Sequence, residues 1–583
     1  MGRLAGVVAL LFALGTTPLW SDLALLARAS GLSYAERRDR LALGFPAAEV
    51  EGLLERELGP DAAIALGPGL RDERMRQRLA ELLYPRPIDA AAPAILERSR
   101  GAFSLRGAAR LDPAAAPPGP RGSPTAFAAA LAAVFTAALA AGAILGLGLL
   151  GVRAARALAP SAPLPARAAP LLGIALLGAT ASAATWLGAP LLTRSACAVA
   201  LPAAALGLAA SRRELAAALR AARERIDPAT ALLAALVAVI CLRMLLLPVF
   251  GWDGRSIWLL HAKQLHAHGF VPRADLLREG LAFSHPEYPL ALPAVLASFA
   301  LPEAVYDERL AAQGLVFLLV AIAGVLFLCA RDRLGGRAAA LLTALYLLGT
   351  VHLSANAYAD GFLAGLLAIQ ALCARAADPR VARLQWVAAL CASLVKQEGL
   401  VFSLCIAVPS LVAGRAGIAR SAARLAVYLP ALGQQAFARA LGLRSDFRGI
   451  AWEALVAAPL ARAGEVAAVL ARELASPGYD RCDTLVWLGL PAFLLASFEV
   501  WRRPALRREG ALLLSPVVAI AAVIVAIFFL TPQDLAWHAG YAFDRLAISP
   551  ALLSLLAAAQ LLHGPGPKVG LPPDRPGHPT SLS

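Results

Sequence analysis

Residues 229–250 read ATALLAALVAVICLRMLLLPVF, and Arg243 is the single charged residue among these 22. A run of this length and composition is typical of a transmembrane helix, which needs about 20 predominantly apolar residues. Comparable runs at about 125–151, 169–189 and 192–210 precede it, and others follow. The whole chain is 59% hydrophobic and only 16% charged, whereas about a quarter of the residues are charged in a soluble domain. We therefore predict an all-α polytopic membrane protein with about fourteen transmembrane helices.

The positive charge of the chain gathers in alternate loops between these runs. A net charge of +15 would favour a nucleic-acid partner in a soluble protein. Here the arginines cluster in loops such as 152–167 and 211–227, and the loops between the clusters are poor in arginine. Because positively charged loops stay on the cytoplasmic side of a membrane, the arginine-rich loops are predicted to be cytoplasmic. Residues 21–123, 251–311 and 434–481 are then predicted to lie outside, and no nucleic-acid partner is expected.

The same pattern divides the chain into five parts. Residues 1–20 are predicted to be a signal-anchor or first transmembrane helix, and residues 21–123 a small extracytoplasmic domain. Residues 124–228 are predicted to be accessory transmembrane helices, 229–562 the main bundle, and 563–583 a disordered cytoplasmic tail rich in Gly and Pro. The seven cysteines show no metal-type spacing, so neither a zinc site nor a disulfide framework is expected.

The polar cluster with the clearest chemistry follows directly after residues 229–250. It begins with Gly251-Trp252-Asp253-Gly254, passes His261 and Lys263, and continues to His285-Pro286-Glu287-Tyr288-Pro289. A carboxylate just beyond a helix end, beside aromatic side chains, suits a general base or a metal contact. The alternative is an interfacial belt of aromatic residues in which Asp253 caps the next helix.

Two shorter clusters interrupt later apolar runs at their predicted outer ends. In the first, Tyr358 and Asp360 begin a run, where Asp360 needs no other role than a helix N-cap. The second is Lys396-Gln397-Glu398-Gly399, and three consecutive polar residues at membrane depth usually line a cavity or a pathway. Only three lysines occur in the chain, and two of them, Lys263 and Lys396, fall in these outer clusters. Where Arg is the default cation, a retained Lys suggests that a compact ammonium group is required.

The last cluster precedes the final apolar run and contains Asp534, His538, Asp544 and Arg545. An arginine at this depth can hold a phosphate through two parallel hydrogen bonds. It can equally pair with Asp544 as a surface anchor.

Taken in order, these phrases resemble those of the GT-C superfamily of membrane glycosyltransferases. The likeness covers roughly residues 240–562 and is greatest to bacterial relatives of the protein O-mannosyltransferases and the lipid A aminoarabinose transferases. It implies a bacterial inner-membrane enzyme that moves one sugar from a polyprenyl-phosphate donor to a glycan, lipid or protein acceptor, on the extracytoplasmic face and with inversion. It implies no cofactor, although a divalent metal stays open.

The resemblance also implies roles for individual residues. Asp253 would be the general base, with Glu287 and Asp360 as further candidate catalytic carboxylates. Lys396 and Arg545 would hold the lipid phosphate. The remaining candidate substrate-binding residues are Lys263, His285, Tyr288, Tyr358, Glu398 and His538. The pattern departs from the family in one respect, because about five spans and an extra domain precede the acidic loop.

Two other functions fit parts of the sequence. A multi-pass transporter or lipid flippase would also have many spans and intramembrane charges, but the chain has no visible internal repeat. A polysaccharide polymerase or ligase would gather Arg and His in one large outer loop, and residues 434–481 contain several arginines.

Overall fold

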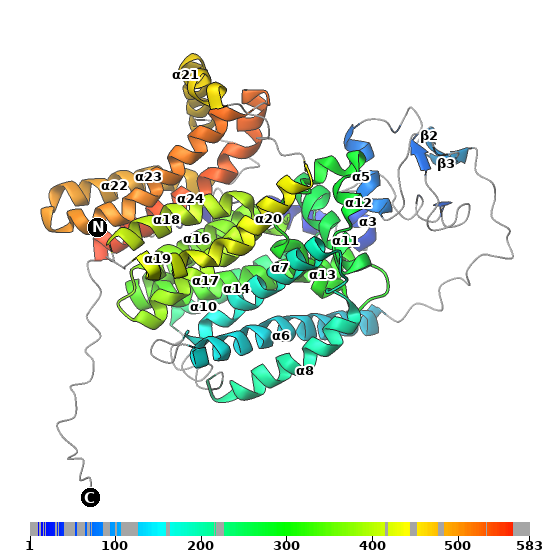
Figure 1. Cartoon of the computed structure of the whole chain (residues 1–583), viewed down its shortest axis with the longest axis horizontal. Coiled ribbons are helices and arrows are strands. Elements are labelled where there is room, and N and C mark those ends of the chain that lie inside the picture. Colours follow the sequence, from blue (N-terminus) through cyan, green and yellow to red (C-terminus); the bar gives the residue numbers. More distant parts are fainter. Residues whose placement is uncertain are drawn as a thin grey trace, which may run out of the picture.

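The computed structural model describes residues 126–158, 164–214, 216, 227–413, 418–443, 452–475 and 483–563 except 532, with short segments of the first 106 residues. Helices make up nearly all of this described part, and they run side by side in one bundle (Figure 1). Within it, eight helices are long and apolar enough to cross a membrane. Four shorter apolar helices add to them, at Leu201–Ala210, Ala291–Ala300, Ala359–Ala374 and Gln397–Val412. The chain is thus a helical protein of the membrane type, and the predicted count of about fourteen full spans is not reproduced by length and composition.

The predicted run at residues 229–250 forms helix α10, Pro228–Leu246. Its start follows from local chemistry, since Asp227 accepts a hydrogen bond from the Thr230 N–H and Pro228 fits the first helical position. The one charge of the run, Arg243, is fully buried and pairs at 2.8 Å with Asp22 of helix α2 (Leu19–Arg28). Helix α2, which follows the first apolar segment, therefore packs against the bundle.

The helices that carry the candidate site follow one another as antiparallel hairpins. They are α14 (Glu308–Leu334), α15 (Gly336–Ala355), α16 (Ala359–Ala374), α17 (Pro379–Val395) and α18 (Gln397–Ala413). Because the turns between them are short, the α15–α16 and α17–α18 connections lie at the same end of the bundle. The final helix, α24 (Leu535–His563), packs against α16, α22 (Asp483–Arg502) and α23 (Arg507–Leu530), and its beginning lies at this same end.

The other helices surround this core. They are α6 (Ala126–Leu158), α7 (Ala169–Leu187) with the short 3-10 turn η4 (Ala166–Ala168), α8 (Arg194–Ala210), α19 (Ile418–Leu425), α20 (Leu429–Ala440) and α21 (Trp452–Ala475). The segment predicted as an outer loop, 251–311, is itself mostly helical. It contains the π-helix η5 (Gly254–Leu259), α11 (Leu260–His268), α12 (Arg273–Leu276), the 3-10 helix η6 (Glu279–Ser284) and the buried apolar helix α13 (Ala291–Ala300).

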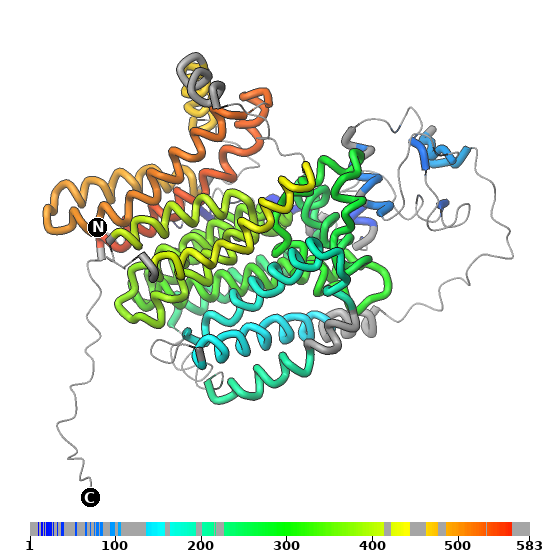
Figure 2. Tube along the Cα trace, viewed as in Figure 1, coloured from blue at the N-terminus to red at the C-terminus, as the bar shows by residue number. Residues whose placement is uncertain are grey.

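The first 106 residues contain a small sheet, which the all-α prediction did not include. Strand β1 (Ile64–Leu66) pairs in parallel with β2 (Ala94–Ser99), and β2 pairs antiparallel with β3 (Ala102–Arg106). A parallel pair needs a crossover, which helix α5 (Glu73–Leu83) provides. Leu79, Leu82 and Leu83 on one side of α5 join the apolar core of this unit. Figure 2 shows α5 lying beside the 251–290 segment at one end of the bundle.

Candidate functional site

A cavity of about 790 Å³ opens at the end of the bundle where the predicted outer clusters meet. Segments from far apart in the chain line it, from α5, from residues 252–288, from the starts of α16, α18 and α24, and from the junction of α17 with α18. The candidate residues that line it are Asp253, His285, Tyr288, Asp360, Lys396, Glu398, His538 and Arg545. Eight of the eleven residues predicted for the site therefore border one space.

Asp253 reaches this cavity because Asn356 fixes the backbone on both sides of it. The side-chain oxygen of Asn356 accepts hydrogen bonds from the N–H groups of Phe250 and Gly251, at 3.2 and 3.3 Å. A Cβ atom on Gly254 would collide with the carbonyl oxygen of Asn356, so only glycine allows this approach. The side chain of Asp253 makes no capping hydrogen bond to the helix that follows, so helix capping does not explain this residue.

The carboxylate of Asp253 instead forms an ion pair with Arg545 of α24. The distance between Asp253 Oδ2 and Arg545 Nη1 is 2.5 Å, and the two side chains are 24% and 16% exposed. The guanidinium group also lies 4.9 Å from the centre of the Tyr358 ring, and its Nε donates to the carbonyl oxygen of Tyr541. The backbone N–H of Arg545 donates to Asp544, whereas the guanidinium group, for which the sequence also allowed a side-chain pair with Asp544, pairs with Asp253.

A second ion pair joins the starts of α16 and α18. Lys396 Nζ lies 2.7 Å from Asp360 Oδ1 and 3.1 Å from Glu398 Oε1, and the Lys396 and Asp360 side chains are both buried. Lys396 ends α17 in an extended conformation, and Gly399 lets α18 start against that end, because a Cβ atom there would collide with the carbonyl oxygen of Ala392. The polar segment Lys396–Gly399 therefore forms the turn between α17 and α18 and places an ammonium group between two carboxylates.

The His285–Tyr288 segment forms the side wall of the cavity. His285 has a φ of 49°, a left-handed conformation that is rare for a residue other than glycine and often marks a functional site. Its ring stacks on Tyr288 with 4.6 Å between the ring centres, and its Nδ1 lies 3.3 Å from Glu287 Oε1. Glu287 itself lines a neighbouring hollow of about 400 Å³, which shares His285, Tyr288 and Glu398 with the main cavity.

Two carboxylate oxygens at this wall are buried without a partner. Glu287 Oε2 and Glu398 Oε2 accept no hydrogen bond within the described part of the chain. An unsatisfied buried acceptor is costly, so both atoms are poised to accept hydrogen bonds from a ligand.

The start of α24 completes the cavity. Asp534 accepts the backbone N–H of Trp537 at 2.7 Å and so caps the helix, while His538 Nδ1 lies 2.7 Å from the Thr531 hydroxyl. These bonds fix the first turn of α24, from which Arg545 follows two turns later on the cavity side.

Lys263 and Tyr358, both predicted to bind substrate, do not line the cavity. Lys263 Nζ donates to the carbonyl oxygen of Leu82 at 2.6 Å, so it stabilises the C-terminal end of α5. Tyr358 lies behind Arg545, and its burial raises its pKa above the usual value, with Asp253 as a smaller cause.

Helix α5 supplies two lining residues that the sequence analysis missed, Gln77 and Arg78. Gln77 accepts a hydrogen bond from the Trp252 indole at 2.8 Å, beside Asp253. The Tyr84 hydroxyl donates to Asp275 at 2.6 Å, and burial together with this bond raises the pKa of Tyr84. The small N-terminal unit is thereby attached to the rim of the cavity by its own helix.

His261 lies beneath this rim rather than in the cavity. It is buried, and its Nε2 lies 3.3 Å from the Ser284 hydroxyl oxygen. Burial lowers the pKa of His261 to about 3, and His285 contributes in the same direction. Because the Ser284 hydroxyl donates to the carbonyl oxygen of Leu281, His261 Nε2 carries the proton and donates to Ser284.

The cavity thus combines carboxylates, two paired cations and aromatic rings, a set suited to proton transfer next to an anionic group. Among the described residues, no three His, Cys, Asp or Glu side chains gather as a metal site would require. Comparisons with protein-family models, with curated proteins and with solved structures find no match to this chain.

Proposed function

We propose that the protein is a membrane glycosyltransferase that transfers one sugar from a polyprenyl-phosphate donor to the hydroxyl group of an acceptor. The observation that carries this proposal is the convergence of Asp253, Arg545 and Lys396 in one cavity, from segments up to 292 residues apart. Among the charged residues of this lining, Asp253 can act as a base, and Arg545 and Lys396 can meet a lipid phosphate.

In this proposal Asp253 is the general base. Its carboxylate removes the proton from the acceptor hydroxyl, and the acceptor oxygen attacks the anomeric carbon of the sugar from the face opposite the phosphate. The bond between the anomeric carbon and the phosphate oxygen breaks, and its electron pair leaves with the polyprenyl phosphate. Attack from the opposite face inverts the anomeric centre.

Arg545 is the first cation that the donor phosphate meets in this proposal. Its pair with Asp253 is the more exposed of the two ion pairs, with 16% and 24% exposure against 9% and 4% for Lys396 and Asp360. A phosphate binds a guanidinium through two parallel hydrogen bonds and stabilises the leaving group. When the phosphate replaces Asp253 as the partner of Arg545, the Asp253 carboxylate loses its cation and is free to accept a proton.

The neighbouring hollow offers a binding wall for the sugar of the donor. His285, Glu287 and Tyr288 line it, and two of them also line the main cavity that holds Arg545. These polar and aromatic side chains suit a sugar ring that extends from a phosphate bound at Arg545. The unpartnered oxygens of Glu287 and Glu398 are available to the sugar hydroxyl groups.

The proposal includes the finer points of topology that the resemblance implies. The cavity would face the extracytoplasmic side of a bacterial inner membrane, and about fourteen helices, some shorter than a full span, would be embedded. Single cysteines introduced within residues 434–481 test this topology when intact cells are treated with a thiol reagent that does not cross the membrane. Labelling of these cysteines only from the cytoplasmic side would contradict the extracytoplasmic placement.

The activity is tested with the full chain in lipid nanodiscs, with a labelled polyprenyl-phosphate hexose and a bacterial envelope extract as acceptor source. We expect label in an acceptor fraction and release of polyprenyl phosphate. Movement of the intact labelled lipid between leaflets without transfer would favour a flippase instead. Transfer of preassembled oligosaccharides but not of single sugars would favour a polymerase or ligase.

A further inference from the structure

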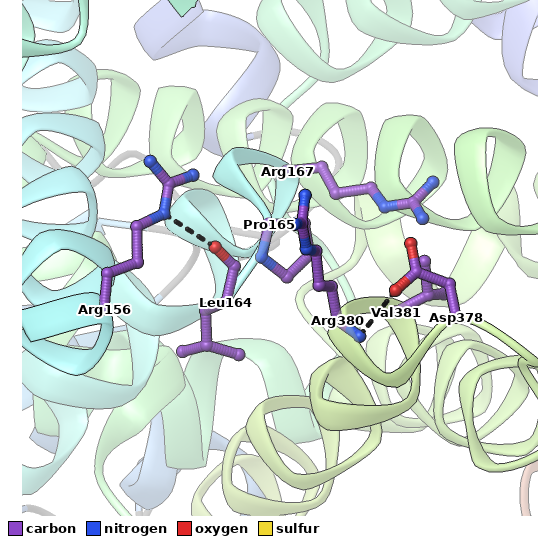
Figure 3. A pocket seen from close by; sticks show the side chains of 7 residues that line it. All are labelled: Arg156, Leu164, Pro165, Arg167, Asp378, Arg380 and Val381. Carbon is purple, nitrogen blue, oxygen red and sulfur yellow. Dashed lines mark hydrogen bonds between the residues drawn. The ribbon is translucent and has the colours of Figure 1, made fainter. Parts of the chain in front are cut away.

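A second polar hollow, of about 440 Å³, lies at the opposite end of α17 from the cavity. Lys396 follows the last residue of α17, whereas Asp378 and Arg380 at its start line this hollow. The 17 residues of the helix separate the two sites by about 25 Å at 1.5 Å per residue. The hollow is lined by Arg156, Leu164, Pro165, Arg167, Asp378, Arg380 and Val381 (Figure 3).

The three arginines of this hollow come from three different elements, the end of α6, η4 and the start of α17. Figure 3 shows Arg380 between Arg156 on the left and Arg167 on the right, with Asp378 on the right as well. Arg156 is held in place, because its Nε donates to the carbonyl oxygen of Leu164 at 2.9 Å and its terminal nitrogens pair with Glu214. Glu214 is not part of the lining.

Arg167 and Arg380 keep donors to offer. Arg167 uses only Nη1, toward Asp332 and the carbonyl oxygen of Leu328, so its Nε and Nη2 have no partner among the described residues. The guanidinium group of Arg380 is exposed and has no hydrogen-bond partner in the described part of the chain, since Asp378 accepts from the Arg380 backbone N–H. Of the three guanidinium groups, Arg156 is paired with Glu214 and Arg167 with Asp332, so Arg380 is the one in this lining without a carboxylate partner among the described residues.

The ligand that fits this chemistry is a phosphate group. Guanidinium groups bind phosphate through paired N–H donors, and Arg167 and Arg380 have donors left for the oxygens of one phosphate. The α17 helix also begins here, and the partial positive charge of a helix N-terminus adds to the attraction.

The position of the hollow favours a lipid phosphate over a free one. It lies between the ends of two candidate membrane spans, Thr136–Ala157 and Ala166–Leu187, which places it at the depth of lipid headgroups. Leu164 and Val381 add apolar surface beside the arginines, as the glycerol and upper acyl region of a lipid requires. We propose that this hollow binds the phosphodiester headgroup of an anionic phospholipid from the adjoining leaflet.

The test measures lipid binding to the purified full chain by native mass spectrometry, with phosphatidylglycerol and phosphatidylcholine as probes. Arg380→Gln removes the one guanidinium of this lining that has no partner among the described residues, so the fold is expected to survive. A basic residue near an anionic lipid surface contributes about 1 kcal/mol, so its loss should weaken phosphatidylglycerol binding about fivefold. The double variant with Arg167→Gln should lose about 25- to 30-fold if the two contributions add.

The matched control is Arg309→Gln, which removes an exposed arginine at the start of α14, where its carboxylate partner is Asp307. It should leave phosphatidylglycerol binding unchanged, and phosphatidylcholine binding should not respond to any of these variants. Equal loss in Arg309→Gln and Arg380→Gln, or equal affinity for the two lipids, would overturn the proposal. Displacement of phosphatidylglycerol by millimolar inorganic phosphate would also overturn it, since the site would then serve a free anion.

Discussion

Replacing Asp253 by Asn should slow transfer and at the same time tighten the binding of polyprenyl phosphate. The variant keeps the size of the side chain but removes the proton acceptor, and loss of a positioned base costs about 10²- to 10⁴-fold in rate. It also removes the negative charge that occupies Arg545 at 2.5 Å. If Asp253 served only to hold the fold, its replacement would weaken both transfer and the binding of polyprenyl phosphate.

The size of the binding effect follows from the ion pair that the phosphate must displace. A hydrogen bond to a charged group contributes about 1.5–3 kcal/mol, and partial exposure of both partners reduces this to about 1–2 kcal/mol. With tenfold in affinity for each 1.4 kcal/mol, Asp253→Asn should bind polyprenyl phosphate about five- to thirtyfold more tightly. The proton transfer and the phosphate contact thus respond in opposite directions.

The assay combines donor turnover in nanodiscs with equilibrium binding of radiolabelled polyprenyl phosphate to the same preparations. The control is Asp307→Asn, which removes a carboxylate from the start of α14, outside the cavity lining. It should change neither measurement. Transfer by Asp253→Asn at a rate near that of the unmodified protein would refute its role as base. Weaker binding of polyprenyl phosphate would refute the competition with Arg545.

Three further predictions concern the frame of the site. Lys396→Met should destabilise the protein by about 3–5 kcal/mol, because Asp360 is left buried without its cation. Adding Asp360→Asn should restore much of the apparent melting temperature. No recovery would show that the pair is not coupled. Gly254→Ala should abolish transfer because the added Cβ atom would collide with Asn356. The control Gly142→Ala, whose added Cβ atom would have nothing within 4 Å, should leave transfer unchanged. Similar activity of the two variants would contradict the packing argument. The pKa of His261 is about 3 when folded and 6.5 when unfolded, so its contribution to stability falls as pH drops from 6.5 toward 3, by about 1.4 kcal/mol per pH unit. His261→Gln should therefore flatten the loss of melting temperature between pH 6.5 and 4.5, and an unchanged slope would show that another group titrates.

The helices were the most predictable part of this protein, because a long apolar run has few alternatives at membrane depth. Residues 229–250 correspond to α10 at Pro228–Leu246, and residues 192–210 to α8 at Arg194–Ala210. The strands escaped prediction since the longest of the three has six residues, too short for an alternating pattern to stand out. The predicted number of about fourteen spans is not confirmed, because apolar composition does not reveal that a helix such as α16 is only 16 residues long.

The candidate site was predictable as a set of residues but not as an arrangement. The physical cost of polar residues at membrane depth correctly directed attention to Lys396 and Glu398. The scarcity of lysine was a poorer guide, because Lys263 binds the end of α5 instead of facing the cavity. Gln77 and Arg78 had no distinguishing signal, since a charged amphipathic helix does not reveal which distant loop it will contact.

The two ion pairs of the cavity differ in a way that divides their proposed roles. Lys396 is shared by Asp360 and Glu398, which begin α16 and α18, so a substrate that removed it would strip both carboxylates of their cation. Arg545 has a single carboxylate partner and greater exposure, so a phosphate can exchange for Asp253 at a smaller cost. In the proposed mechanism Lys396 therefore holds the floor of the cavity, while Arg545 makes the exchange. If that exchange uncovers Asp253 only after the phosphate has arrived, the proposed base would become available only when the donor is in place. The proposed transferase would then not deprotonate acceptors that have no sugar to receive.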